Sequence, residues 1–149
     1  MFTNPRPQTP NPEVKMSNIH IQVIMPNRVK LKEHIDSAIL PGIEGDFEIL
    51  ESHSPFMTKL RPGMLKIVKD KEISYYAVHD GFVTVENDEI LILSETCENQ
   101  KEIDIKRATA AKERAEKRLS ELSETDTNFR RAEIALKRAI SRINTYNAT

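Results

Sequence analysis

Residues 103–143 have the sequence IDIKRATAAKERAEKRLSELSETDTNFRRAEIALKRAISRI, and this stretch decides the architecture of the C-terminal part. It contains no glycine or proline and is rich in alanine, lysine, arginine and glutamate. Apolar residues recur at steps of three and four, which places one apolar stripe on each of two helices. The stripes are Ala108, Ala111, Ala115, Leu119 and Leu122 in the first helix, and Phe129, Ala132, Leu136, Ala139 or Ile140, and Ile143 in the second.

Residues 123–128, with the sequence SETDTN, are turn and cap formers that separate the two helices. So short a link predicts that the helices fold back as an antiparallel hairpin. Apolar burial stabilises by about 25 cal/mol per Å², and an alanine methyl group offers little area. Exposed charge pairs add only about 0.3–0.5 kcal/mol each. We therefore expect a weakly docked hairpin that leaves its resting place at small cost.

The chain before the hairpin has the period-two pattern of β-strands. Ile19, Ile21, Val23 and Met25 alternate with more polar residues. Further short apolar runs follow at residues 29–35, 37–40, 47–50, 56–60, 65–68, 73–78, 82–86 and 90–94. Turn signals such as Asp80-Gly81 separate these runs. Many short strands at close intervals predict an all-β sandwich or flattened barrel.

The composition is that of a chain with one small domain and an appendage: 149 residues, 38% hydrophobic and 30% charged. We expect a disordered, proline-rich lead-in over residues 1–16, a β-sandwich over 17–98 and the helical hairpin over 99–149. Residues 1–100 have a net charge of −5 and residues 101–149 one of +4. Because the basic part is almost free of aromatics, we expect no nucleic-acid binding. No apolar run approaches about 20 residues, so we expect no membrane insertion.

The sequence offers little to catalysis. The single cysteine, Cys97, excludes an internal disulfide, and we expect an inert or half-exposed thiol. The histidines lack ligand spacing, so we expect no metal site. His53 and Ser54 are adjacent, but neighbouring side chains on an extended chain point apart, and no acid is placed to orient the histidine. A small hydrolase using this pair is therefore a poor hypothesis, and we expect no catalytic residues.

Charged residues converge at the predicted open end of the hairpin, where the first helix starts and the second ends. Asp104 and Arg107 come from the first helix, Arg138 and Arg142 from the second, and Glu98 from the incoming linker. Arginine forks suit phosphate, and a carboxylate could accept from an exocyclic amine. A solvated Asp104–Arg107 ion pair and a solvent-exposed arginine face explain the same spacing. Spacing alone favours that second interpretation.

Several motifs, in their order along the chain, resemble the epsilon subunits of bacterial F-type ATP synthases, from about residue 17 to the end. They are Leu40-Pro41-Gly42-x-x-Gly45-Asp46-Phe47, His53-Ser54-Pro55, Leu60-x-Pro62-Gly63, Gly81-Phe82-x-x-Val85, and two helical segments at residues 110–116 and 131–139. The chain departs from the family pattern at Glu48, where a small residue is common, and at Asp80, where a glycine is usual. The proline-rich front is also foreign to it.

The resemblance implies a non-catalytic rotor subunit at the cytoplasmic face of the bacterial cell membrane, with no required cofactor. Its sandwich would dock on the gamma subunit and the c ring, which couples catalysis to ion translocation. Its hairpin would lie folded, or extend along gamma into the catalytic alpha/beta hexamer and inhibit ATP hydrolysis. The basic residues Arg130, Arg131 and Lys137 of the second helix would then meet an acidic region of the catalytic subunits.

In some bacterial members the folded hairpin binds ATP through an Ile/Leu-Asp-x-x-Arg-Ala motif, and residues 103–108 match it in full. The ATP ligands that the resemblance implies are Glu98, Ile103, Asp104, Arg107, Ala108, Arg138 and Arg142. A ligand that contacts both helices favours the folded hairpin by mass action. The alternative from another class is a stand-alone adaptor without nucleotide binding. It predicts apolar residues at the hairpin tip, where this chain has Ser123, Glu124, Thr125 and Asp126.

Overall fold

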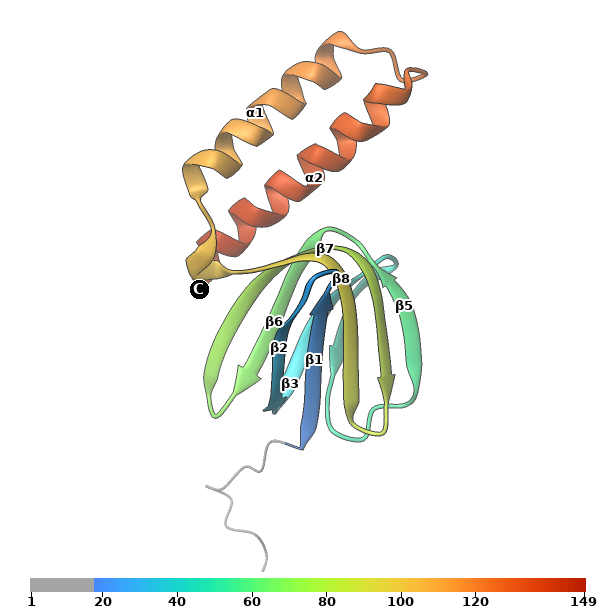
Figure 1. Cartoon of the computed structure of the whole chain (residues 1–149), viewed down its shortest axis with the longest axis vertical. Helices are drawn as coiled ribbons and strands as arrows, with labels where there is room; N and C mark the ends of the chain where they lie inside the picture. Colours follow the sequence, from blue (N-terminus) through green and yellow to red (C-terminus); the bar gives the residue numbers. More distant parts are fainter. Residues whose placement is uncertain (1–17) are drawn as a thin grey trace, which may run out of the picture.

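The structure is a computed structural model that describes residues 18–149, so the predicted lead-in over residues 1–16 lies outside the described residues. Eight strands come first and two helices last, joined by a single 3₁₀ turn (Figure 1). The strands are β1 (Ile19–Met25), β2 (Arg28–Ile35), β3 (Ser37–Gly42), β4 (Gly45–Ile49), β5 (Phe56–Leu60), β6 (Gly63–Lys69), β7 (Glu72–Glu86) and β8 (Glu89–Asn99). The helical part comprises η1 (Gln100–Glu102), α1 (Ile105–Glu121) and α2 (Thr127–Asn147).

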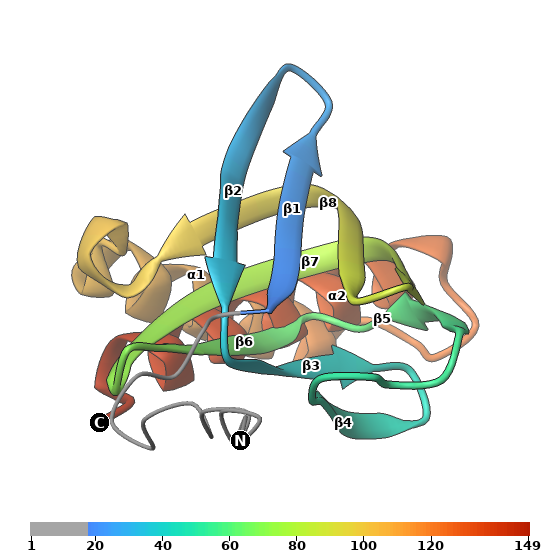
Figure 2. The ribbon, with the colours of Figure 1, turned by 90° about the horizontal axis from the view of Figure 1, so that it is seen from below.

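The strands form one strongly curved sheet in the order β2-β1-β8-β7-β5-β3-β4, with β6 pairing to both β3 and β7. The pairing of β1 with β8 is parallel, and the other strand pairs are antiparallel. Viewed from below, β1 and β2 stand over the layer made by β3, β5, β6 and β7 (Figure 2). The predicted all-β sandwich followed by an antiparallel two-helix hairpin is confirmed.

Large aliphatic side chains fill the space inside this sheet. In β1 the predicted alternation holds, because Ile19, Ile21 and Val23 are all at most 1% exposed. Val29 in β2 is an exception and is 52% exposed. The β1–β2 register shifts between Val23 and Ile24, so Val29 pairs with Ile24 rather than continuing the inward alternation. An extra residue in one strand reverses the faces of the residues beyond it.

The Asp80-Gly81 signal was expected to separate two strands, and this prediction is wrong. Residues 72–86 form one continuous strand, β7, which pairs with β8 on both sides of the dipeptide. Asp80 and Gly81 have φ angles of 50° and 138°. These positive angles change which residues face inward, from Tyr76 and Val78 before the dipeptide to Val83 and Val85 after it. The dipeptide therefore marks a distortion within a strand and not a chain reversal.

The two helices pack along the predicted alanine stripes. Ala108 and Ala115 of α1 and Ala132 and Ala139 of α2 are buried. Ala139 rather than Ile140 belongs to the stripe, since Ile140 is 38% exposed. The Asp126 carboxylate caps α2 by accepting from the backbone N–H of Asn128 at 2.9 Å. α2 lies between α1 and the barrel (Figure 1).

A second face of α2, not predicted from the sequence, packs on the barrel. It contacts β6 and β7 and buries Ser141 and Thr145. The Ser141 hydroxyl donates to the backbone carbonyl of Gly63 in β6 at 2.8 Å. On β7, Ala77 and His79 alternate with the inward-facing Tyr76 and Val78 yet are buried, which indicates that α2 covers them. The hairpin is thus attached to the barrel through its second helix.

The end of α2 is tied to η1. The Gln100 side-chain amide donates to the backbone carbonyls of Tyr146 and Ala148, at 3.2 and 2.5 Å. These contacts satisfy carbonyl groups that have no partner within a helix end. Because η1 also leads into α1, it brings the beginning of α1 beside the end of α2.

Candidate functional site

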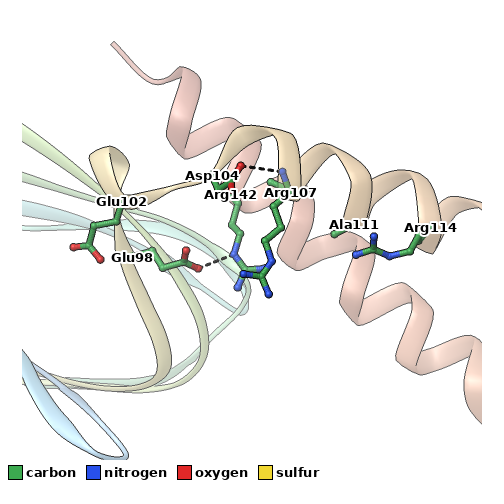
Figure 3. A pocket seen from close by; sticks show the side chains of 8 residues that line it. Glu98, Glu102, Asp104, Arg107, Ala111, Arg114 and Arg142 are labelled. Carbon is green, nitrogen blue, oxygen red and sulfur yellow. Dashed lines mark hydrogen bonds and ion pairs between the residues drawn. The ribbon is translucent and has the colours of Figure 1, made fainter.

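A pocket of about 510 Å³ lies at the open end of the hairpin, between α1, the end of α2 and the end of β8 (Figure 3). Its lining carries three acids, three arginines and two alanines. These are Glu98, Glu102, Asp104, Arg107, Ala108, Ala111, Arg114 and Arg142. The predicted convergence of the first helix start with the second helix end is therefore present.

Asp104 is the N-cap of α1, and its role differs from a solvated ion pair. Its carboxylate accepts from the backbone N–H of Arg107 at 3.1 Å, which satisfies one donor at the helix start. It makes no ion pair with the Arg107 guanidinium among the described residues. The Asp104 carboxylate is therefore engaged by the backbone at the start of α1, and the Arg107 side chain faces the pocket.

The other two acids of the lining are each held by a cation. The Glu98 carboxylate accepts from Arg142 Nε at 2.6 Å, and the Glu102 carboxylate accepts from Lys30 at 2.6 Å. Glu98 was expected on a linker, but the structure has it in β8, because that strand continues five residues beyond the predicted end at residue 94. A strand position fixes the Glu98 backbone more firmly than a linker would.

Two arginines of the lining have no ion-pair partner among the described residues. Within residues 18–149, neither Arg107 nor Arg114 forms an ion pair. Figure 3 shows the guanidinium groups of Arg107 and Arg142 reaching into the same part of the pocket. Like charges gathered at one opening favour an anion, and guanidinium forks match phosphate oxygens with paired hydrogen bonds. The site is thus suited chemically to a ligand with several phosphate oxygens.

The structure unites most of the predicted ligand residues but not all of them. Glu98, Asp104, Arg107, Ala108 and Arg142 line the pocket. Ile103 lies just before α1 and is itself buried, with 6% of its surface exposed.

Arg138 does not line the pocket in this structure, and its role as an ATP ligand stays a prediction. Its guanidinium donates to the carboxylate of Asp80 on β7, which turns it toward the barrel. Asp80 is available for this contact because of the β7 distortion, and sequence spacing along α2 could not reveal a partner 58 residues away.

Arg114 lines the pocket and was not predicted. The signal was in the sequence: Asp104, Arg107, Ala111 and Arg114 follow one another at steps of three, four and three. Residues at these steps share one face of a helix. Extending the motif by two turns would have found this third arginine.

His79 lies under α2 and is 1% exposed. Its Nδ1 is hydrogen-bonded to the Thr96 hydroxyl at 2.7 Å. Burial, and then the charges of Arg142 and Arg138, lower the pKa of His79 from 6.5 to about 4. The imidazole is therefore neutral at pH 7, and its protonation opposes the docking of α2.

The remaining candidates for chemistry are inactive in this geometry. Cys97 is buried at 1% exposure, and burial raises the pKa of its thiol to about 12, so of the two expected states, inert or half-exposed, the structure supports the inert one. The His53 ring is hydrogen-bonded to the backbone carbonyl of Ser54 and not to its hydroxyl. Residues 18–149 hold no group of three or more His, Cys, Asp or Glu side chains that could bind a metal ion.

The basic residues predicted to meet a partner, Arg130, Arg131 and Lys137, are exposed on α2. They lie outside the pocket lining and outside the face that packs on the barrel. Among the described residues, neither helix is long and apolar enough to cross a membrane.

Comparisons with known proteins agree with this architecture over residues 18–147. The family described as ATP synthase, Delta/Epsilon chain, beta-sandwich domain matches residues 18–100, and its long alpha-helix domain matches residues 101–147. The chain therefore belongs to the ATP synthase delta/epsilon chain family. Bacterial relatives narrow this further, and we conclude that it is a non-catalytic subunit of the epsilon type found in bacterial F-type ATP synthases.

The relatives are similar over most of their length. The ATP synthase epsilon chain of Desulforamulus reducens is 42% identical over 83% of this chain and 92% of its own. The epsilon chain of Geotalea daltonii is 39% identical over 84% of this chain and 91% of its own length. The epsilon chain of Halalkalibacterium halodurans is 36% identical over 87% of this chain and 97% of its own length. A chain in the mitochondrial ATP synthase of Euglena gracilis shares the fold, with a TM-score of 0.74 and 21% identity over 94% of this chain and 88% of that one.

Proposed function

We propose that this subunit is a rotor element of the ATP synthase and that its hairpin is a brake released by ATP. The barrel docks on the gamma subunit and the c ring, and the hairpin adopts a folded and an extended form. In the extended form, α2 enters the catalytic alpha/beta hexamer and inhibits ATP hydrolysis. ATP binds the pocket at the open end of the folded form and favours that form.

The observation that carries the nucleotide proposal is the pocket itself. It lies where the Ile103-to-Ala108 motif meets the end of α2, and it holds two arginines with no acidic partner. A triphosphate is the kind of anion that such an arginine set binds, because its oxygens accept paired hydrogen bonds. The predicted ligand Arg142 is already present, and the unpredicted Arg114 adds a third guanidinium to the lining.

The regulatory part of the proposal rests on linkage. The pocket takes its lining from α1, α2 and β8, so it exists only while the hairpin is folded against the barrel. A ligand at 100 times its dissociation constant stabilises the form that binds it by about 2.7 kcal/mol. That is enough to move a closely balanced equilibrium almost completely to the folded form.

Placement in the central stalk is supported by similarity to other ATP synthases. A chain in the central stalk and c-ring structure of the Tetrahymena thermophila mitochondrial enzyme has a TM-score of 0.55 at 16% identity, which covers 89% of this chain and 96% of that one. When the barrel is attached to the rotor and the hairpin extends, the exposed basic residues Arg130, Arg131 and Lys137 are free to contact the catalytic hexamer.

Calorimetry of the full chain with ATP tests the nucleotide proposal. We expect saturable binding that is lost in Arg107→Ala and strongly reduced in Asp104→Ala, since the first removes a phosphate ligand and the second the cap that sets the start of α1. Arg118→Ala is the matched control, because Arg118 lies on α1 outside the pocket. Equal binding by wild type, Arg107→Ala and Arg118→Ala would refute a site in this pocket. Co-elution of the chain with gamma is the corresponding test of rotor assembly.

A further inference from the structure

Asp80 occupies an unusual position in the barrel. It lies within β7 with a φ angle of 50°, a left-handed conformation that Asp and Asn tolerate better than most residues. The next residue, Gly81, must be glycine, because a Cβ atom there would lie 1.8 Å from the carbonyl oxygen of Leu93. This distorted pair sits on the part of the barrel that α2 covers, so a side chain at position 80 is within reach of that helix.

The Asp80 carboxylate accepts a hydrogen bond from the Arg138 guanidinium and forms an ion pair with it. Both side chains keep partial access to water, 38% for Arg138 and 45% for Asp80. The pairing is also incomplete, because Nε of Arg138 is buried and has no hydrogen-bond partner among the described residues. Asp80 therefore holds the guanidinium without satisfying it.

Arg138 and Arg142 lie four residues apart on α2 and so share one face of the helix. Arg142 lines the pocket, whereas Arg138 is turned to Asp80. The two arginines thus have parallel arrangements, each held by one barrel carboxylate, Glu98 in β8 or Asp80 in β7. They differ in that Glu98 is itself part of the pocket lining and Asp80 is not.

We propose that Asp80 competes with ATP for Arg138 and thereby lowers the affinity of the folded hairpin for the nucleotide. This inference rests on the proposed nucleotide site and adds its regulation. In the ligand-free form the carboxylate occupies Arg138. In the nucleotide-bound form the guanidinium leaves Asp80 and donates to phosphate oxygens, and its unpaired Nε–H gains an acceptor.

The size of the effect follows from the strength of the competing pair. A partly exposed ion pair of this kind is a weak contact, so it reduces the affinity of a competing ligand by up to about fivefold. A phosphate group carries more charge and more acceptor oxygens than one carboxylate, which allows the exchange. The Asp80–Arg138 pair could have the opposite effect. If it mainly fastened α2 to the barrel, its loss would weaken ATP binding.

Calorimetry with ATP on four full-length variants separates these roles. Asp80→Asn removes the charge and keeps a residue that tolerates the left-handed backbone. We expect it to lower the dissociation constant by up to about fivefold, and Arg138→Gln to raise it. In the Arg138→Gln background, Asp80→Asn should have no effect. The matched control is Asp46→Asn, which breaks an exposed aspartate–arginine pair with Arg61 that does not touch the hairpin.

Unchanged or weaker binding by Asp80→Asn, with normal binding by the wild type, would overturn the role of Asp80 and leave the nucleotide site standing. The same gain in the presence and absence of Arg138 would overturn competition for that arginine. Absence of ATP binding in the wild type and in every variant would overturn the nucleotide site together with this inference. Thermal unfolding of each variant reports whether it is folded.

Discussion

The interior of the barrel and the interface between α2 and the barrel are built from different side chains. The interior is filled by large aliphatic residues such as Ile21, Leu40 and Leu65, all at 0% exposure. On the α2 side, the interface buries the small side chains of Ser141 and Thr145. Burying a leucine or isoleucine stabilises by about 1.5–3 kcal/mol, and small side chains bury much less area. One chain thus contains a permanent platform and an element suited to leaving it.

Polar contacts at the interface strengthen this contrast. α2 is held by Arg138 to Asp80, by Ser141 to the Gly63 carbonyl and by Arg142 to Glu98. Each hydrogen bond contributes about 0.5–1.5 kcal/mol net, since water replaces it when the helix leaves. Water does not replace the apolar contacts of the barrel core in this way. The contacts at the interface therefore give the hairpin a defined resting place at a low cost of departure.

The largest effect is expected from a cavity in the barrel. Leu65→Ala should lower the free energy of unfolding by about 2–5 kcal/mol, because Leu65 is fully buried in the core cluster. Urea denaturation followed by far-ultraviolet circular dichroism measures it. Ile140→Ala, at a 38% exposed position of α2, is the comparison and should cost much less. Equal losses in the two variants would contradict the division into platform and detachable element.

Acidification should act on the interface rather than the core. The pKa of His79 is about 4 in the docked state, below its ordinary value of 6.5, so the undocked state binds more protons between these values. Docking is fully favoured above pH 6.5 and weakens as the pH falls toward 4, by at most roughly 3 kcal/mol, the value reached when burial under α2 accounts for the whole shift. Arg138 and Arg142 of α2 oppose the protonation and Asp80 of β7 favours it.

Amide hydrogen exchange of α2 at pH 7 and pH 5, corrected for intrinsic rates, measures this effect. His79→Gln, which does not titrate, should lose the dependence on pH between these values. A wild-type chain whose α2 protection is the same at both pH values would show that His79 does not couple protonation to docking.

A smaller effect is expected from one hydrogen bond. Ser141→Ala removes the donor to the Gly63 carbonyl and should weaken docking of α2 by about 1 kcal/mol, with the barrel unaffected. Exchange protection of α2 relative to β7 reports the difference. Ser120→Ala on α1 is a suitable control, because its hydroxyl donates only within its own helix, to the Lys117 carbonyl. A loss of protection in both elements would indicate that the interface is part of one cooperative unit.

The spacing of apolar residues was enough to predict both the helical hairpin and the β-strands of the barrel. The alanine stripe of Ala108, Ala115, Ala132 and Ala139 follows from the 3.6-residue period, and the buried face of β1 from the two-residue period. The Asp80-Gly81 distortion could not be predicted, because a turn and an irregular strand both use residues that tolerate positive φ. Whether such a dipeptide reverses the chain depends on the strands beside it.

The part of the candidate site that depends on the two helices alone was predicted from the sequence. Asp104, Arg107 and Arg142 were expected together because an antiparallel hairpin joins the start of one helix to the end of the other. The attachment of Arg138 to Asp80 depends on the docking of α2 across β7, which spacing within the hairpin does not contain. Weak docking of the hairpin stays a prediction, with physical support from the small side chains at its interface.

Native-state hydrogen exchange of the full chain, with and without ATP, tests the central claim most directly. The account predicts that α2 amides exchange through an opening of much lower free energy than that of β7 amides. It also predicts that saturating ATP slows exchange in α2 by the factor 1 + [ATP]/Kd, with Kd taken from calorimetry, and leaves β7 unchanged. Exchange of α2 only through global unfolding together with the barrel, and indifferent to ATP, would contradict the account.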